Sequence, residues 1–472
     1  MLAELEVTSA ERSDNGQKSK VLDHAYNQAM ERIRGQAPEH QKLANRVLSW
    51  IACATRNLTL SELRHGLAVE FNTPELDEDN MPDIEQAVSV CAGLVIVDEK
   101  SNAVRLVHYT TQEYFERTYN EWFFQGHINI TKACLTYLSF KDFDGDHFLT
   151  PMKMAMRTWS NPLYYYAALN WGYHARKAYM EEDKLVLDFI HNTSKLLVCG
   201  HFIRQGQLGR GLGSVDMESM HLTACLGLSK SMSILLEGSH DVDPRDSLYM
   251  TPLLWAAMQG HEAAVKLLLE NGADVNSADA WGMTSLSRAA KRGHEAVVKL
   301  LLEWSADTEE KTRKGDTPLI MAAEEGHEAV VRALLGGNAI IEARNKSGYT
   351  ALLLAVQNGH EAVVSLLLEK GANTEIKGYL DRTPLLIAVE NRDDAMVRLL
   401  LNKNPNIEAR DSKGLTPLSL AAWGGDETVV RRLLERNANI NSKCGRGFTA
   451  FYLAAKGGHK AVADLLKEAR AL

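Results

Sequence analysis

The C-terminal half of the chain alternates short apolar stretches with polar turns in one fixed order. In the unit that begins at Thr251, the apolar residues 253–257 are followed by a Gly-His turn and by the mainly apolar residues 265–269. Valine and leucine in the second stretch recur at spacings of three and four, which is the period of an amphipathic helix. The order returns every 33 residues. It predicts pairs of short helices that bury their apolar faces only by stacking on neighbouring pairs.

A threonine opens each unit, and the residues after it have defined roles in a helix. Threonine accepts a hydrogen bond from the first free N–H groups, and proline at the next position loses no hydrogen bond there. A glycine about ten residues later is expected to end the first helix in a left-handed conformation. The threonines are Thr251, Thr284, Thr317, Thr350, Thr383, Thr416 and Thr449.

This pattern strongly resembles the ankyrin repeat, which has the same period and a Thr-Pro-Leu-His phrase. The resemblance implies an α-solenoid of eight units over residues 218–472, with a degenerate first unit and a last unit that stops at Glu468. Two units replace Gly-His by Arg392-Asp393 and by Gly425-Asp426. We expect these departures to weaken a connection between helices without changing the fold.

The recurring His-Glu pairs, such as His261-Glu262, contain half of the zinc-protease HExxH motif. Valine stands at the second histidine position, as at Val265, so no zinc site is predicted. We expect the histidines to organise the turn between the two helices by hydrogen bonding. The six cysteines include no CxxC pair, which excludes a disulfide framework and favours reduced thiols inside the cell.

The N-terminal part has a different pattern, with longer helical stretches followed by two short strands. Thr59 and Glu62 predict a capping box at the start of one helix, and Thr110 is expected to cap the helix after the strands. Helices followed by a hairpin predict a winged-helix unit. The expected helices are residues 21–34, 41–54, 60–70 and 83–91, and the expected strands are residues 94–97 and 104–107.

The sequence of residues 20–210 resembles the segment that follows the NACHT NTPase module in fungal NACHT–ankyrin (STAND) proteins. The phrases that carry this resemblance are residues 46–51, 58–63, 88–94 and 107–115, with the aromatic phrases 161–166 and 170–172. The aromatic residues are expected to form the core of a helical connector. They are Trp159, Tyr164, Tyr165, Tyr166, Trp171 and Tyr173.

The sequence contains no GxxxxGK[ST] loop, so the NTPase half of that architecture is missing and nucleotide hydrolysis is not implied. We expect a truncated relative, a shortened gene model or a stand-alone derivative. The predicted fold is mainly α, an ankyrin-repeat solenoid preceded by a small α+β winged-helix domain and a helical connector. The predicted domains are a disordered tail (1–20), the winged-helix-like domain (21–125), the connector (126–205), a glycine-rich linker (206–217) and the ankyrin domain (218–472).

Charge argues against nucleic acid and anionic membranes as partners. The formal net charge is −9, and the stretch between Arg64 and Lys100 in the winged helix contains no Lys or Arg but nine acidic residues. A DNA-reading winged helix needs basic residues there. No apolar run is long enough to span a bilayer. We expect a cytoplasmic protein, with the nucleus as an alternative, that has no catalytic residues, cofactor or small-molecule substrate.

The resemblance to ankyrin proteins implies a partner-binding groove formed by the turns before each threonine and by the first helices. Aromatic residues, methionine and arginine are enriched at interface centres, and several stand at these positions. The predicted partner-binding residues are Met250, Met258, Trp281, Met283, Arg292, Tyr349, Tyr379, Leu380, Leu415, Trp423 and Phe448.

These features predict a non-catalytic interaction protein whose array captures a protein partner and whose winged helix is regulatory. The resemblance implies a role in NACHT-type signalling. A regulatory fragment that acts in trans on a separate NTPase is the first alternative, and a nucleic-acid-binding regulator is the second.

Overall fold

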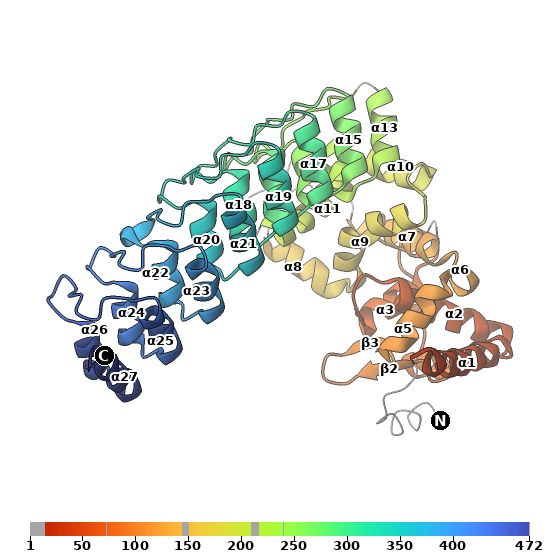
Figure 1. Ribbon diagram of the computed structural model, residues 1–472. Coiled ribbons are helices and arrows are strands. Elements are labelled where there is room, and N and C mark those ends of the chain that lie inside the picture. The colour runs from red at the N-terminus through yellow and green to blue at the C-terminus, as the bar shows by residue number, and fades with distance from the viewer. Residues whose placement is uncertain (1–14, 72, 144–150, 209–216, 239, 472) are drawn as a thin grey trace. The chain divides into compact units, whose positions relative to one another are not determined.

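The structure is a computed structural model that describes residues 15–71, 73–143, 151–208, 217–238 and 240–471. It divides into two compact units, residues 1–239 and residues 240–472. Both are mainly helical, as predicted (Figure 1). Within the described ranges no helix has the length and apolar character needed to cross a bilayer. The predictions for residues 1–14 and 209–216 lie outside the described residues.

The first unit begins with helices that surround a small antiparallel sheet. The strand order is β1-β3-β2, and Val95 of β2 is opposite Leu106 of β3. Two α-helices, one short strand, two further α-helices and a hairpin follow one another in the order of a winged helix, which confirms that part of the predicted fold. The elements are α1 (Asn15–Arg34), α2 (Pro38–Cys53), β1 (Leu58–Thr59), α3 (Leu60–Ala68), η1 (Glu78–Asn80), α4 (Ile84–Ser89), β2 (Val95–Asp98), β3 (Ala103–Leu106) and α5 (Tyr109–Arg117).

The Thr59–Glu62 capping box is confirmed, because Glu62 N–H donates to the Thr59 hydroxyl while the Glu62 carboxylate accepts the Thr59 N–H. The predicted cap at Thr110 is wrong. His108 is the N-cap of α5, and its Nδ1 accepts the Thr110 N–H. The Thr110 hydroxyl instead lies 2.6 Å from the Tyr26 hydroxyl of α1, so it is used to join two helices.

The start of α1 and the presence of β1 also differ from prediction. α1 begins at Asn15, before the predicted start at Val21. Lysine and glutamine in its first turns favour helix, but these residues lack the apolar periodicity on which the prediction depended. β1 was not predicted, since two residues are too short to show an alternation.

The remainder of the first unit is a bundle of helices. Of the predicted aromatic core, Tyr164, Tyr166 and Trp171 are fully buried. Trp159 and Tyr165 are exposed, which corrects the prediction for them: Trp159 lies near the end of α8, and Tyr165 contacts Phe202 edge-on. The helices are α6 (Tyr119–Trp122), α7 (Gly126–Tyr137), η2 (Lys141–Phe143), α8 (Pro151–Ser160), α9 (Leu163–Lys177), α10 (Lys184–Ile190), α11 (Thr193–Leu208), α12 (Ser219–Leu226) and α13 (Ser229–Glu237).

The pair α12 and α13 carries the first, degenerate register of the repeat, and it packs within the same unit as the connector. The Ser219 hydroxyl donates to the Ile190 carbonyl at 2.6 Å, and the Lys230 N–H donates to the Glu181 carboxylate at 2.9 Å. These bonds join the pair to α10 and to the turn before it.

The second unit is a row of stacked helix pairs (Figure 1). Each of the seven threonines accepts a hydrogen bond from the N–H three residues later, as predicted. The pairs are α14 (Pro252–Gln259) with α15 (Glu262–Glu270), α16 (Ser285–Arg292) with α17 (Glu295–Glu303), α18 (Pro318–Glu324) with α19 (Glu328–Gly336), α20 (Ala351–Gln357) with α21 (Glu361–Glu369), α22 (Pro384–Glu390) with α23 (Asp394–Leu401), α24 (Pro417–Gly424) with α25 (Glu427–Glu435), and α26 (Ala450–Lys456) with α27 (Lys460–Ala471).

The recurring histidines join successive repeats, which corrects the expectation that they organise only their own turn. His294 Nε2 lies 3.0 Å from the carbonyl oxygen of Met258 in the preceding repeat, and His327 makes the same bond to Lys291. The ring fits because the residue beneath it is a glycine: a Cβ on Gly260 would lie 2.6 Å from the His294 ring. Burial lowers the pKa of His294, so the neutral ring is the form that fits.

The two units without this histidine use a different contact. Asp393 and Asp426 each accept the N–H of the residue three positions later and so cap α23 and α25. The departures therefore replace a bond between repeats by a cap within one repeat.

A column of acidic or amide side chains, eight residues before each threonine, also joins the repeats. The Glu309 carboxylate accepts the Ile340 N–H at 2.8 Å, and Glu342 and Glu375 bind the equivalent amides of the next repeats. Each such residue satisfies a turn amide one repeat further along.

Replacing Gly293 by alanine is expected to destabilise the array by about 2–3 kcal/mol. Gly293 has a φ of +78°, and a Cβ there would lie 2.7 Å from Nδ1 of His327. Gly272 is a matched control because its φ is +88° and its Cβ would meet no atom within 4 Å. Gly272→Ala should therefore cost about 1 kcal/mol, for the backbone alone. Urea unfolding of the full chain measures both, and equal losses would show that the histidine contact is unimportant.

Candidate partner-binding surface

Six-residue turns, here called fingers, precede each threonine and project from one edge of the array. They are residues 245–250, 278–283, 311–316, 344–349, 377–382, 410–415 and 443–448. In several fingers the second residue accepts two backbone amides; Asp279 Oδ1, for example, accepts those of Trp281 and Met283 at 2.8 and 3.0 Å. Backbone bonds connect neighbouring fingers, as from Arg313 N–H to Trp281 O at 2.9 Å. The fingers are therefore an ordered surface.

Four of the predicted partner-binding residues are buried, which corrects the prediction for them. Met250, Met258, Met283 and Leu415 are each less than a tenth exposed. The residue before the threonine points toward the helix stack where it is aliphatic. Met250 and Met258 are placed around the buried guanidinium of Arg288, with each sulfur 3.8 Å from one of its nitrogens. These side chains stabilise the array and cannot contact a partner in this conformation.

Seven predicted residues reach the surface in the structure. Tyr379 is 63% exposed and Trp423 56% exposed, and Arg292 is also exposed. The half-buried group is Trp281, Tyr349, Leu380 and Phe448. The Arg288 guanidinium lies over the Trp281 ring at 5.3 Å from its centroid. One face of this indole therefore already contacts a side chain of its own repeat.

The finger 377–382, which carries Tyr379, has an unusual backbone. Leu380 and Asp381 have φ values of 58° and 57°, whereas the corresponding single left-handed position is glycine in five other fingers. Left-handed non-glycine residues cost about 1–2 kcal/mol each. The short helix η3 (Tyr379–Asp381) that results presents Tyr379 to solvent.

Two exposed aromatic residues of the fingers and first helices were not predicted. Tyr249 is 59% exposed at the fifth position of its finger, where glycine is usual. Tyr452 is 43% exposed in α26 and stacks on Phe448 with 4.4 Å between ring centroids. The available signal was an aromatic residue at a position that has no aromatic residue in any other repeat.

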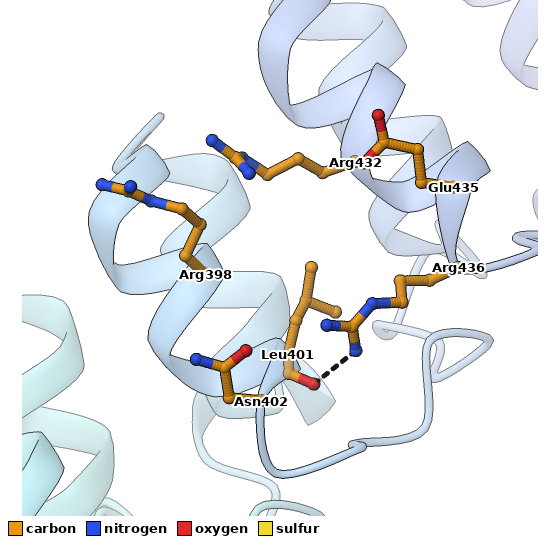
Figure 2. Close-up of a pocket in the computed structure, with 6 residues that line it drawn as sticks. All are labelled: Arg398, Leu401, Asn402, Arg432, Glu435 and Arg436. Atoms are coloured by element: carbon orange, nitrogen blue, oxygen red, sulfur yellow. Dashed lines mark hydrogen bonds between the residues drawn. The ribbon is translucent and has the colours of Figure 1, made fainter.

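A pocket of about 170 Å³ lies on a different face, between α23 and α25 (Figure 2). The Arg436 guanidinium donates to the Leu401 carbonyl at 2.7 Å, and Arg432 forms two hydrogen bonds with Asp394. The Arg432 guanidinium is the main cause that lowers the pKa of Asp394. Because these groups already hold two repeats together, the pocket is a seam within the array and no ligand site is assigned to it.

Reactive side chains do not gather at a site in the part of the chain that the structure describes. No group of three or more His, Cys, Asp or Glu residues there could hold a metal ion. All six cysteines are buried, and burial raises the pKa of Cys53, Cys91 and Cys199 to about 12. These thiols are protonated at neutral pH and are poor nucleophiles.

Comparison with known proteins assigns both parts of the chain. The winged-helix domain of GPI inositol-deacylase matches residues 30–121. A family described as ankyrin repeats (3 copies) matches residues 220–312, 305–378 and 374–444, and one described as ankyrin repeats (many copies) matches residues 424–466. A comparison with curated proteins gives no match.

Two solved structures are similar to the array. The ankyrin repeat domain of Bcl-3, described as a unique member of the IkappaB protein family, is 32% identical, with a TM-score of 0.43, and the match covers 46% of this chain and 98% of that one. The human ASB11 ankyrin repeat domain is 29% identical, with a TM-score of 0.44, and the match covers 47% of this chain and 99% of that one. With ankyrin repeats matched from residue 220 to residue 466, more than half of its length, the chain belongs to the ankyrin-repeat proteins.

Proposed function

We propose that this ankyrin array is a non-catalytic scaffold that captures a protein partner on its fingers and first helices. The observation that carries the proposal is the exposure of Tyr379 and Trp423, two large aromatic side chains, on the ordered surface of the fingers and first helices. Large aromatic residues on an ordered surface are the usual anchors of protein interfaces. The strained finger around Tyr379 supports the same surface, since such backbone is concentrated at functional sites.

We assign a regulatory role to the winged-helix domain, in signalling of the NACHT type. Its helix α4 contains no Lys or Arg, which disfavours the alternative of a nucleic-acid-binding regulator. The other alternative, a fragment acting in trans on a separate NTPase, would be favoured by co-purification of the chain with an NTPase. We infer no enzymatic activity from the winged-helix match, because that match covers only the winged-helix domain, residues 30–121. The six cysteines are buried and form no disulfide bond, which fits a reducing compartment, the cytoplasm or the nucleus.

Replacing Tyr379 and Trp423 together by alanine is expected to weaken partner capture by about 30-fold, or about 2 kcal/mol. The loss follows from removing two exposed anchors that make no core contacts. Affinity capture with the full chain, followed by quantitative mass spectrometry and titration of the enriched partner, measures this change.

A control of matched composition replaces Trp304 and Tyr179, which are 42% and 83% exposed but lie outside the fingers and first helices. This variant should retain the partner. If the Tyr379/Trp423 variant captures the partner as well as the control does, the surface is assigned incorrectly.

A further inference from the structure

Five consecutive fingers form a strongly basic edge. The fingers 311–316, 344–349, 377–382, 410–415 and 443–448, here called the basic fingers, contain eleven Lys or Arg residues and three Asp residues, a net charge of +8. The first two fingers contain one Arg and two Asp. The chain as a whole has a net charge of −9, so positive charge is concentrated on this edge of an acidic protein.

One column of this edge is basic in every one of these repeats. It consists of Lys311, Arg344, Lys377, Arg410 and Lys443, spaced 33 residues apart, and all five are exposed. Arg344 and Arg410 each donate to the carbonyl oxygen of the next column residue, at 3.1 and 2.7 Å. These contacts hold the side chains along the row and leave their positive charge uncompensated.

Of the eleven basic residues, ten are exposed and one, Arg382, is half-buried and paired with Glu390. The other ten make no ion pair with a carboxylate within the described residues. By contrast, exposed basic residues on the second helices pair along their own helix, as Lys299 does with Glu295 at 2.6 Å. The basic fingers therefore present charge that is available to a partner.

The surroundings of the basic fingers favour a polypeptide over a nucleic acid. Glu309 and Glu342 stand two residues before column residues, and Glu325 is exposed on the adjoining first helix. Each strand of a nucleic acid duplex carries a phosphate about every 3.4 Å of the helix axis, and a duplex would meet these carboxylates along its whole length. An extended polypeptide presents side chains on one face only about every 7 Å. It can therefore place acidic residues against the basic column and apolar residues against Tyr379 and Trp423.

We infer that the basic fingers bind an extended acidic segment of the protein partner. This assignment rests on the proposed function and specifies the chemistry of the partner. The charged side chains steer the segment to the edge of the array, and the exposed aromatic side chains hold its apolar residues.

The test measures binding of the full chain to a fluorescent polyglutamate peptide and to an oligothymidylate of equal length. The variant Arg313→Gln, Lys346→Gln, Lys413→Gln and Arg446→Gln removes one charge from each of four fingers. Within the described residues, these four side chains form no ion pair. It should weaken polyglutamate binding about tenfold, since each exposed pair contributes modestly, and should flatten the salt dependence of the dissociation constant. A control with the same loss of charge, Lys266→Gln, Lys299→Gln, Arg332→Gln and Arg431→Gln on the second helices, should change binding less than about twofold.

Two results would overturn the assignment. Equal loss in both variants would mean that polyglutamate responds only to total charge, and tighter binding of oligothymidylate that is lost in the finger variant would identify a nucleic-acid surface. The proposed function is tested separately, because partner capture that depends on Tyr379 and Trp423 but not on the four finger charges would leave it intact and remove only this inference.

Discussion

Replacing Asp279 by alanine should destabilise the array by about 3–5 kcal/mol, because it leaves a buried guanidinium without its anion. The side chain of Asp279 is fully buried and that of Arg288 is 10% exposed. Arg288 Nε donates to Asp279 Oδ2 at 2.9 Å, and its Nη2 binds the same oxygen. The other carboxylate oxygen of Asp279 holds two amides of its finger. The substitution therefore removes an ion pair and two turn bonds together.

The next repeat supplies a matched rescue. Thr312 and Met321 occupy the positions equivalent to Asp279 and Arg288, both are buried, and the Thr312 hydroxyl accepts the Asp316 N–H at 3.1 Å. The double variant Asp279→Thr/Arg288→Met should lie within about 1.5 kcal/mol of the parent, since an apolar replacement of a whole buried pair is well tolerated. Hydrogen exchange of residues 278–303 in the full chain reports local opening in both variants. If the double variant opens as readily as Asp279→Ala, the loss arises from the finger and not from the unpaired charge.

The parts of the fold that depend on local residue chemistry were predictable from the sequence. A threonine before a helix, a proline at its first position and a glycine at its end each act within a few residues. Their recurrence at one period predicted the helix pairs from Thr251 to the C-terminal end, and the hairpin at residues 95–106 predicted the winged helix.

The contacts that were not predicted join side chains to groups on other elements of the fold. The bond from His294 to the Met258 carbonyl, the Thr110–Tyr26 hydroxyl contact and the Asp279–Arg288 ion pair depend on how elements pack. A spacing of 33 residues shows which side chains share a column, but not whether the column faces solvent or the neighbouring helix. For that reason Met250, Met258, Met283 and Leu415 were assigned to the surface although they are buried.

The aromatic part of the candidate site was predicted correctly only in part. Trp423 and Tyr379 are exposed as predicted, whereas Trp281, Tyr349 and Phe448 are half-buried. Arg288, in contrast, gave no signal of burial in the sequence, since charged residues are almost never buried unless paired.

Lowering the pH from 7 to 5 should destabilise the first unit by about 4 kcal/mol, through the buried pair His127 and His174. Their Nδ1 atoms lie 2.7 Å apart, so one neutral ring donates to the other, and His174 Nε2 lies 2.9 Å from the Tyr166 hydroxyl. Burial lowers the pKa of His127 to about 4 and that of His174 to about 3. The charge of Lys177 lowers the pKa of His127 further, and His127 in turn lowers the pKa of His174.

The direction follows from the two protonation states. In the unfolded chain both rings bind protons below a pH of about 6.5, whereas the folded pair stays neutral until a pH of about 4. Stability from the pair is therefore fully present above a pH of about 6.5 and is lost as the pH falls toward 4, by about 2 kcal/mol per ring between pH 7 and pH 5. Urea unfolding at the two pH values, with hydrogen exchange of α7 and α9 to identify the first unit, measures the loss.

The double variant His127→Phe/His174→Phe separates this titration from that of the carboxylates. It should be less stable at pH 7, because the Tyr166 hydroxyl loses a partner, but its stability should fall much less between pH 7 and pH 5. The ring protons of His127 and His174 should also keep constant NMR shifts down to pH 5 in the parent. A titration of either ring above a pH of 6, or an equal fall in both proteins, would show that the pair does not set the acid sensitivity of this unit.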